Sequence, residues 1–150
     1  MKTFRFSLEA MLRIQRAFVR HEEMRLSKLL GERAQFDNSL NEVLQRSQRY
    51  SEGIQNAALE TTSGAELAFG TLVMASYAQE ASRIRAELHR LTPKIIEQRS
   101  RYLGAQREQE KLEKLEERAR AAWMLEHNRR EQQVADELYL LRRHAVTMTP

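Results

Sequence analysis

The chain has 150 residues, of which 41% are hydrophobic and 31% charged, with 5 glycines, 2 prolines and no cysteine. So few turn-forming residues argue against a compact globule and favour long exposed helices. The lack of cysteine excludes disulfides and thiolate metal sites, and no apolar run approaches the ~20 residues that a membrane span needs. The small excess of 25 basic over 21 acidic residues admits both acidic proteins and nucleic acid as partners.

The first third of the sequence predicts one long helix, over about residues 7–60, with Ser7 as a suitable N-cap. The residues before it lack the continuous apolar core of a signal peptide, so we expect a cytoplasmic protein. Apolar residues then recur at alternating steps of three and four, with Arg33 and Ser47 filling two positions of the series. These seam residues are Leu26, Leu29, Phe36, Leu40, Val43, Tyr50, Ile54 and Ala57. Such spacing turns one helix face toward a partner helix.

A short break follows, and we expect a turn at about residues 59–64. Ser63 and Glu66 have the spacing of a capping box, which predicts the start of a second helix over about residues 64–143. Gly70 is expected to be a weak point in its first turns. Pro93 is expected to kink or briefly interrupt it.

The second helix carries its own seam, and the two seams together predict the fold. Its positions are Met74, Tyr77, Ala81, Ile84, Leu88, Leu91, Ile95, Tyr102, Ala105 and Leu112. We therefore predict an all-α protein: a long antiparallel two-helix coiled-coil hairpin, forming a single domain over residues 1–150. The second helix would overhang the first by roughly 25 residues, or ~37 Å. Apolar residues of this overhang, such as Trp123, Val134 and Leu138, would bind a partner or fold back.

The sequence offers no catalytic site. It contains no phosphate-binding glycine loop and no His-Glu-x-x-His motif, and its four histidines are scattered. The carboxylate pairs Glu22-Glu23 and Glu116-Glu117 are interpreted as solvated flank charges, because two helices supply no cleft. We expect no enzymatic activity, no cofactor and no metal.

Arginines crowd both the beginning and the last third of the sequence, and an antiparallel hairpin brings these regions to one end. Acidic residues are interleaved with them, whereas nucleic-acid binders usually show a cleaner basic stripe. An end-on protein partner is favoured, ordinary solvation remains open, and no nucleic acid is expected. Tyr50 and Tyr77 are expected to pack in the seam while also serving as partial anchors for a partner.

Several segments resemble one protein family. The opening Phe4-Arg5-Phe6-Ser7-Leu8 resembles the Phe-x-Phe-x-Leu start of flagellar FliJ proteins, and Ser63-Gly64-Ala65-Glu66-Leu67 looks like the start of their second helix. Residues 110–115, Trp123, residues 129–132 and residues 136–138 are similar to their C-terminal region. Stalk proteins of virulence type III secretion systems share this layout.

The resemblance implies a stalk and escort factor in flagellar type III protein export. Its implied partners are the hexameric export ATPase, the cytoplasmic domain of the export-gate membrane protein, and export chaperones. Its implied location is the cytoplasm, peripherally associated with the inner membrane at the flagellar base. The residues implied for ATPase binding are Arg13, Arg16, Arg20, Arg129, Arg130 and Arg142, and those for gate binding are Val43, Tyr50, Met74, Tyr77 and Ala81. A virulence-system stalk and a structural dimeric scaffold remain alternatives.

Overall fold

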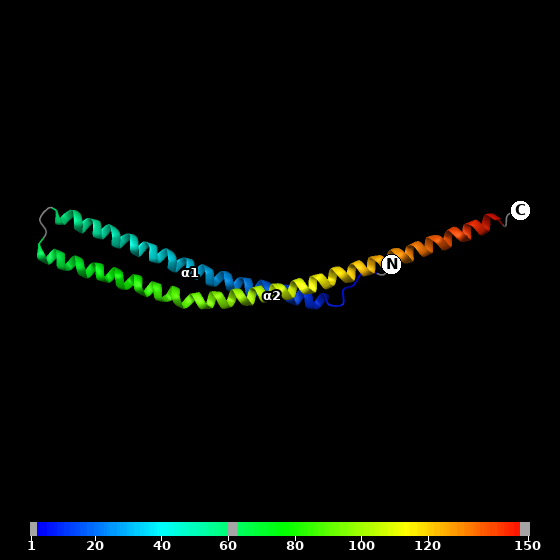
Figure 1. Cartoon of the computed structure of the whole chain (residues 1–150), viewed down its shortest axis with the longest axis horizontal. Coiled ribbons are helices and arrows are strands. Elements are labelled where there is room, and N and C mark those ends of the chain that lie inside the picture. The colour runs from blue at the N-terminus through cyan, green and yellow to red at the C-terminus, as the bar shows by residue number, and fades with distance from the viewer. Residues whose placement is uncertain (1–2, 60–62, 148–150) are drawn as a thin grey trace. The chain divides into compact units, whose positions relative to one another are not determined.

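The computed structural model describes residues 3–59 and 63–147, with side chains through residue 144. These residues form two helices, α1 (Glu9–Ala58) and α2 (Gly64–Thr147), and no strand lies among them (Figure 1). The predicted all-α two-helix hairpin is confirmed. The chain divides into two compact units, Met1–Val19 with Gly104–Pro150 and Arg20–Leu103, and each contains a stretch of both helices.

The helix ends follow from local hydrogen bonds. At the start of α1 the backbone N–H of Leu12 donates to the carbonyl of Leu8 at 2.9 Å, so Leu8 rather than Ser7 supplies the first helical acceptor. At the start of α2 the backbone N–H of Ser63 donates to the Glu66 carboxylate at 3.0 Å, and the Glu66 N–H donates to the Ser63 hydroxyl at 3.3 Å. The predicted capping box is confirmed. Of the predicted turn, residues 60–62 lie outside the described residues.

Helix α2 continues through Pro93, so the expected brief interruption is wrong. Proline removes one backbone hydrogen bond, here to the carbonyl of His89. Both Pro93 and His89 are exposed, so the loss falls on the solvent side of the helix and leaves the packed side intact. The neighbouring Thr92 hydroxyl donates to the carbonyl of Leu88 at 2.9 Å.

In the unit Arg20–Leu103 the two helices pack along the predicted seam. Val43, Ala81, Leu91 and Ile95 each retain only 3% of their accessible surface. Gly70 belongs to the same seam, because a Cβ placed on it would lie 2.8 Å from Cδ1 of Ile54. Gly70 is buried, so its lack of a side chain also makes room for Ile54 of α1.

The seam of this unit also holds a polar contact. Glu22 is 3% exposed and Gln98 is 7% exposed, so the interpretation of Glu22 as a solvated flank charge is wrong. The Gln98 side-chain amide donates both to the Glu22 carboxylate and, at 3.1 Å, to the Glu22 backbone carbonyl. Burial is tolerated because the carboxylate has this partner and Arg25 lies 3.7 Å from it.

The unit containing the two chain ends pairs the start of α1 with the middle of α2. Leu12, Val19 and Ala105 are buried there, and the Gln15 side-chain amide donates to the Ala105 carbonyl at 3.0 Å. Beyond this pairing, every side chain of residues 128–144 on α2 is exposed. The predicted overhang is thus a stretch of helix whose side chains are not covered by other described residues.

Candidate interaction surfaces

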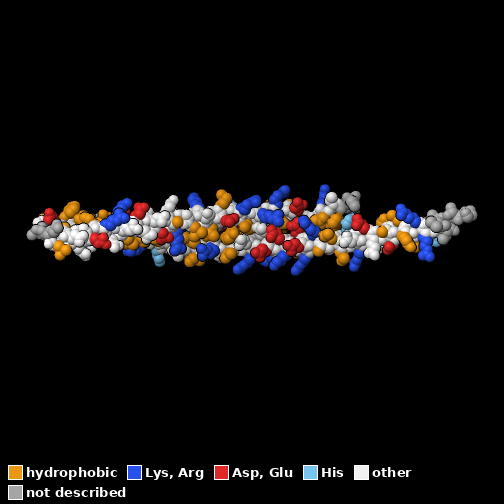
Figure 2. Space-filling model, turned by 90° about the horizontal axis from the view of Figure 1, so that it is seen from above, with side chains coloured by type: hydrophobic (Ala, Val, Ile, Leu, Met, Phe, Trp, Pro, Cys, Tyr) orange, Lys and Arg blue, Asp and Glu red, His pale blue; other side chains and the backbone are white. Residues whose placement is uncertain are grey.

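The six arginines implied for ATPase binding are all exposed, but the five that belong to one unit do not form one cluster. Arg13 and Arg16 lie on α1, and Arg129, Arg130 and Arg142 lie on α2 of the same unit, whereas Arg20 belongs to the other unit. Arg16 contacts Glu113 on α2. The helix rises about 24 Å from Glu113 to Arg129, so Arg16 and Arg129 lie far apart. Figure 2 shows acidic and basic side chains interleaved on the face that it displays.

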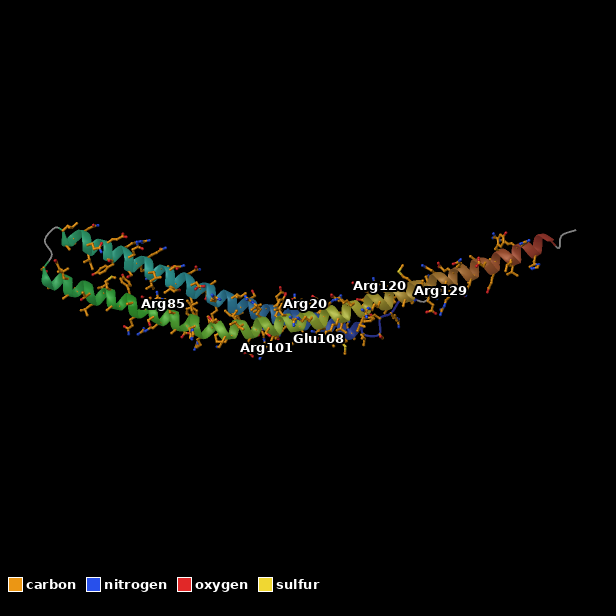
Figure 3. All side chains as sticks on the ribbon, in the orientation of Figure 1. Arg20, Arg85, Arg101, Glu108, Arg120 and Arg129 are labelled. Carbon is orange, nitrogen blue, oxygen red and sulfur yellow. The ribbon has the colours of Figure 1, made fainter. Side chains whose placement is uncertain are left out.

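Two of the six arginines already have partners within the protein. Arg16 lies 3.2 Å from the Glu113 carboxylate, and Arg130 forms an ion pair with Glu126. Among the described residues, Arg13, Arg20, Arg129 and Arg142 form no ion pair; Figure 3 labels Arg20 and Arg129. The unpaired guanidinium groups are the ones that a partner could engage without breaking an existing contact.

The contact between Arg16 and Glu113 links the two helices and affects the pKa of Glu113. Its carboxylate accepts hydrogen bonds from the Gln109 side-chain amide at 2.9 Å and from Arg16 at 3.2 Å. The Gln109 hydrogen bond is the main cause that lowers the pKa of Glu113; Arg16 lowers it further, while partial burial opposes both. Arg16 therefore helps to hold α1 on α2 as well as being a candidate for partner binding.

An aromatic contact near the beginning of the chain was not foreseen. The centroids of the Phe4 and Trp123 rings lie 6.0 Å apart, and the Arg120 guanidinium lies 5.5 Å from the Phe4 centroid. Trp123 also stacks on His127, with 4.9 Å between ring centroids. The segment before α1 is thus held on α2, and Trp123, which was expected on an unpaired overhang, contacts Phe4.

The residues implied for gate binding fall into two groups. Val43 and Ala81 are buried in the seam. Tyr50, Met74 and Tyr77 are partly exposed; the two tyrosine rings meet edge to face at 6.2 Å, and the Ser47 hydroxyl lies 3.9 Å from the Met74 sulfur. Only the second group presents side-chain surface that a partner could reach in this arrangement.

Two exposed apolar side chains occur a few residues earlier on α2, on a different face of the helix from Met74, and sequence reasoning missed them. Phe69 is 64% exposed and Leu72 is 69% exposed, and their spacing of three places them on one face of α2. A signal was present: residues 67–79 carry no charge in a chain that is 31% charged. A contiguous exposed apolar patch marks an interaction site more often than single exposed apolar residues do.

The residues that the structure describes contain neither a metal-binding cluster nor a helix suited to spanning a membrane. No group of three or more potential metal-ligating side chains occurs in residues 3–59 and 63–144. Within the part of the chain that the structure describes, no helix has the length and apolarity needed to cross a membrane.

Two long antiparallel helices with exposed apolar and basic surfaces define an α-helical coiled-coil protein suited to binding other proteins. The chain belongs to the flagellar FliJ protein family, whose model matches residues 4–146. The predicted family is confirmed. Membership implies a role connected with flagellar type III protein export, in a family of non-enzymatic components. The comparison with curated proteins and the comparison with solved structures each give no match.

Proposed function

We propose that this protein is the stalk and escort component of flagellar type III export. In this role the arginines near the two chain ends bind the export ATPase ring, and the part near the turn binds the cytoplasmic domain of the export gate. Export chaperones are its further partners. It acts in the cytoplasm, peripherally at the inner membrane of the flagellar base, and the family match supports this setting.

The observation that carries the proposal is the exposed stretch of α2 over residues 128–144. It combines arginines with large apolar side chains, including Val134, Leu138 and Leu141, that are more than half exposed. An amphipathic mixture on an uncovered helix is what a protein partner buries. Acidic groups of the ring pair with Arg129 and Arg142 on α2 and with Arg13 on α1.

The gate contact is proposed for Tyr50, Met74 and Tyr77. Aromatic side chains that are partly buried and partly exposed are typical anchors at protein interfaces. Val43 and Ala81 contribute indirectly, because they are buried in the seam between the two helices that carry Tyr50 and Tyr77.

A charge-reversal experiment tests the ATPase contact. We expect Arg13→Glu combined with Arg129→Glu to weaken binding to the purified export ATPase about tenfold or more, since complementary charge is replaced by repulsion. Both residues are exposed and neither forms an ion pair with a described residue, so helicity measured by circular dichroism should be unchanged. Titration by isothermal calorimetry measures the affinity.

Arg49→Glu is the matched control, because Arg49 is exposed on α1 and forms no ion pair with the described residues. It should bind the ATPase as the native protein does. Undiminished binding of the double variant would contradict the ATPase contact. Self-association of the native protein with no capture of ATPase or gate domain would favour the scaffold alternative.

A further inference from the structure

The outer face of α2 carries a shallow groove around its proline, and the groove shares no residue with the surfaces proposed above. This groove, called the Pro93 groove, is lined by Ala86, His89, Arg90, Thr92, Pro93 and Ile96. All six residues are exposed, while their neighbours Leu91 and Ile95 are buried in the seam. The groove thus lies on the side of α2 that faces away from α1.

The floor of the groove is apolar. Ile96 is 64% exposed, and the proline ring and the methyl group of Ala86 lie on the same face of the helix. Pro93 also leaves the carbonyl of His89 without its helical donor, whereas the Thr92 hydroxyl is already engaged by Leu88. An apolar side chain and one hydrogen-bond donor could therefore be accommodated here.

The surroundings of the groove are strongly basic. From residue 83 to residue 101, α2 has six Lys and Arg residues but only two glutamates. Both glutamates are occupied, Glu87 by Arg90 at 2.8 Å and Glu97 by Arg101 at 2.6 Å; Figure 3 labels Arg85 and Arg101 on this helix. The remaining cations have no ion pair with any described residue: Arg83, Arg85, Lys94 and Arg99.

Helical geometry places these cations on both sides of the groove. With about 100° between successive residues, Arg85 and Arg99 flank the Pro93–Ile96 face on one side, and Arg90 and Lys94 flank it on the other. Charge on both rims and an apolar floor between them match a ligand that has carboxylates on either side of one apolar residue.

We propose that the Pro93 groove binds an acidic, amphipathic peptide segment of a partner protein. One apolar side chain of that segment rests on Pro93 and Ile96, and its carboxylates pair with Arg85, Lys94 and Arg99. This inference goes beyond the proposed function, because none of these residues belongs to the ATPase or gate surfaces. Its failure would leave those surfaces untouched.

Other anionic ligands fit this face less well. A nucleic acid would need an unbroken basic track with aromatic stacking groups, but glutamates interrupt the track and the groove lining contains no Phe, Tyr or Trp. An anionic membrane would need a wide apolar face on the helix, and Ile96 is the large aliphatic side chain in the groove.

A peptide titration with the full chain tests the proposal. The probe is a fluorescein-labelled helical peptide of Glu, Ala and Gln with a single central leucine, and its anisotropy is followed as protein is added. Two matched peptides replace the leucine by alanine or every glutamate by lysine. We expect saturable binding of the probe that weakens about tenfold or more between 50 and 300 mM salt, weaker binding of the alanine peptide, and none of the lysine peptide.

Variants then locate the site. Arg85→Glu with Lys94→Glu and Arg99→Glu should weaken the probe about tenfold or more, and Ile96→Ser should weaken it about threefold or more. Arg49→Glu and Met24→Ser are the matched controls, since both residues are exposed on α1 of the same unit. Each should bind the probe normally, and circular dichroism checks that every variant remains helical.

Pro93→Ala separates a binding role from a merely structural one. It should raise the melting temperature, because the helix regains a hydrogen bond, and yet lower the affinity for the probe. No binding of the probe up to 1 mM protein, equal binding of the lysine peptide, or full affinity in the charge-reversed variant would overturn the proposal. Tighter binding of single-stranded DNA or of anionic lipid vesicles at the same residues would also overturn it, in favour of that ligand.

Discussion

Glu113 shows how a single side chain connects the two helices in this protein. Its carboxylate is held between Gln109 on its own helix and Arg16 on α1. These contacts favour the charged form and lower its pKa. Both partners remain partly exposed, so we expect the Arg16–Glu113 ion pair to contribute only about 0.2–1 kcal/mol to stability.

The lowered pKa predicts a pH dependence of stability. Glu113 is charged more readily in the folded chain than in the unfolded one, so its stabilisation is present above the usual glutamate pKa of about 4.5 and is lost as the pH falls through the lower folded value. We expect the native protein to lose more stability between pH 6 and pH 3 than Glu113→Gln does. Urea unfolding at each pH measures the difference, and parallel curves would contradict the assignment.

Two glycines predict opposite responses to alanine. Gly31→Ala should raise the free energy of unfolding by about 0.5–1 kcal/mol, because alanine favours the helix and a Cβ there meets nothing within 4 Å. Gly70→Ala should raise the free energy of unfolding by less than Gly31→Ala does, or should lower it, since its Cβ would lie 2.8 Å from Ile54 Cδ1.

Ile54→Val removes the Cδ1 atom that a new Cβ would meet. The double variant Gly70→Ala, Ile54→Val should therefore recover part of the alanine gain relative to Ile54→Val alone. Thermal unfolding of the native protein and the four variants measures these gains, and equal gains at Gly31 and Gly70 would show that the seam does not crowd Gly70.

At the scale of the helices, α2 has two very different faces. Leu91 and Ile95 are each 3% exposed, whereas Ile96, one residue on, is 64% exposed. The step of one residue turns a side chain by about 100° around the helix. Burial in this unit is thus decided by heptad position and not by hydrophobicity.

The contrast between faces predicts the effect of a charge. Leu91→Asp should destabilise the protein by about 3 kcal/mol or more, because an unpaired carboxylate would be forced into the seam. Ile96→Asp, the matched control, should change stability by about 0.5 kcal/mol or less, as exposed substitutions usually do. Equal melting temperatures of the two variants would be incompatible with this seam.

The Glu22–Gln98 contact gives the seam a polar position. A polar residue in a coiled-coil seam costs stability but disfavours other registers, because a shifted pairing would leave it buried without a partner. Gln98 bonds both the side chain and the backbone carbonyl of Glu22, so this contact defines which residues of α1 and α2 lie opposite each other in its unit.

For the whole molecule, the exposed stretch of α2 predicts separable effects on stability and binding. Deletion of residues 128–150 removes side chains that are exposed wherever the structure describes them, so we expect the melting temperature to change by no more than about 2 °C. The same deletion should abolish detectable binding to the export ATPase. A large drop in melting temperature would show instead that this stretch is folded onto the rest of the protein.

Much of this fold could be predicted from the sequence because its information is local and periodic. Heptad spacing predicted Val43, Ala81, Leu91 and Ile95 as seam residues, and all four are buried. Ser63 and Glu66 predicted the start of α2 because a capping box involves only residues three apart. The family was recognisable because short motifs occur in order along nearly the whole chain.

What could not be predicted depends on which residues of α1 and α2 lie opposite each other. The burial of Glu22 requires Gln98 across the seam, the crowding of Gly70 requires Ile54, and the docking of Phe4 requires Trp123. The spacing of apolar residues along one helix shows which face of that helix is apolar. It does not show which residues of the other helix lie opposite. The amino-acid sequence alone therefore determined the two helices and their facing seams, whereas the tertiary structure decided the pairing, because pairing depends on contacts between residues distant in the chain.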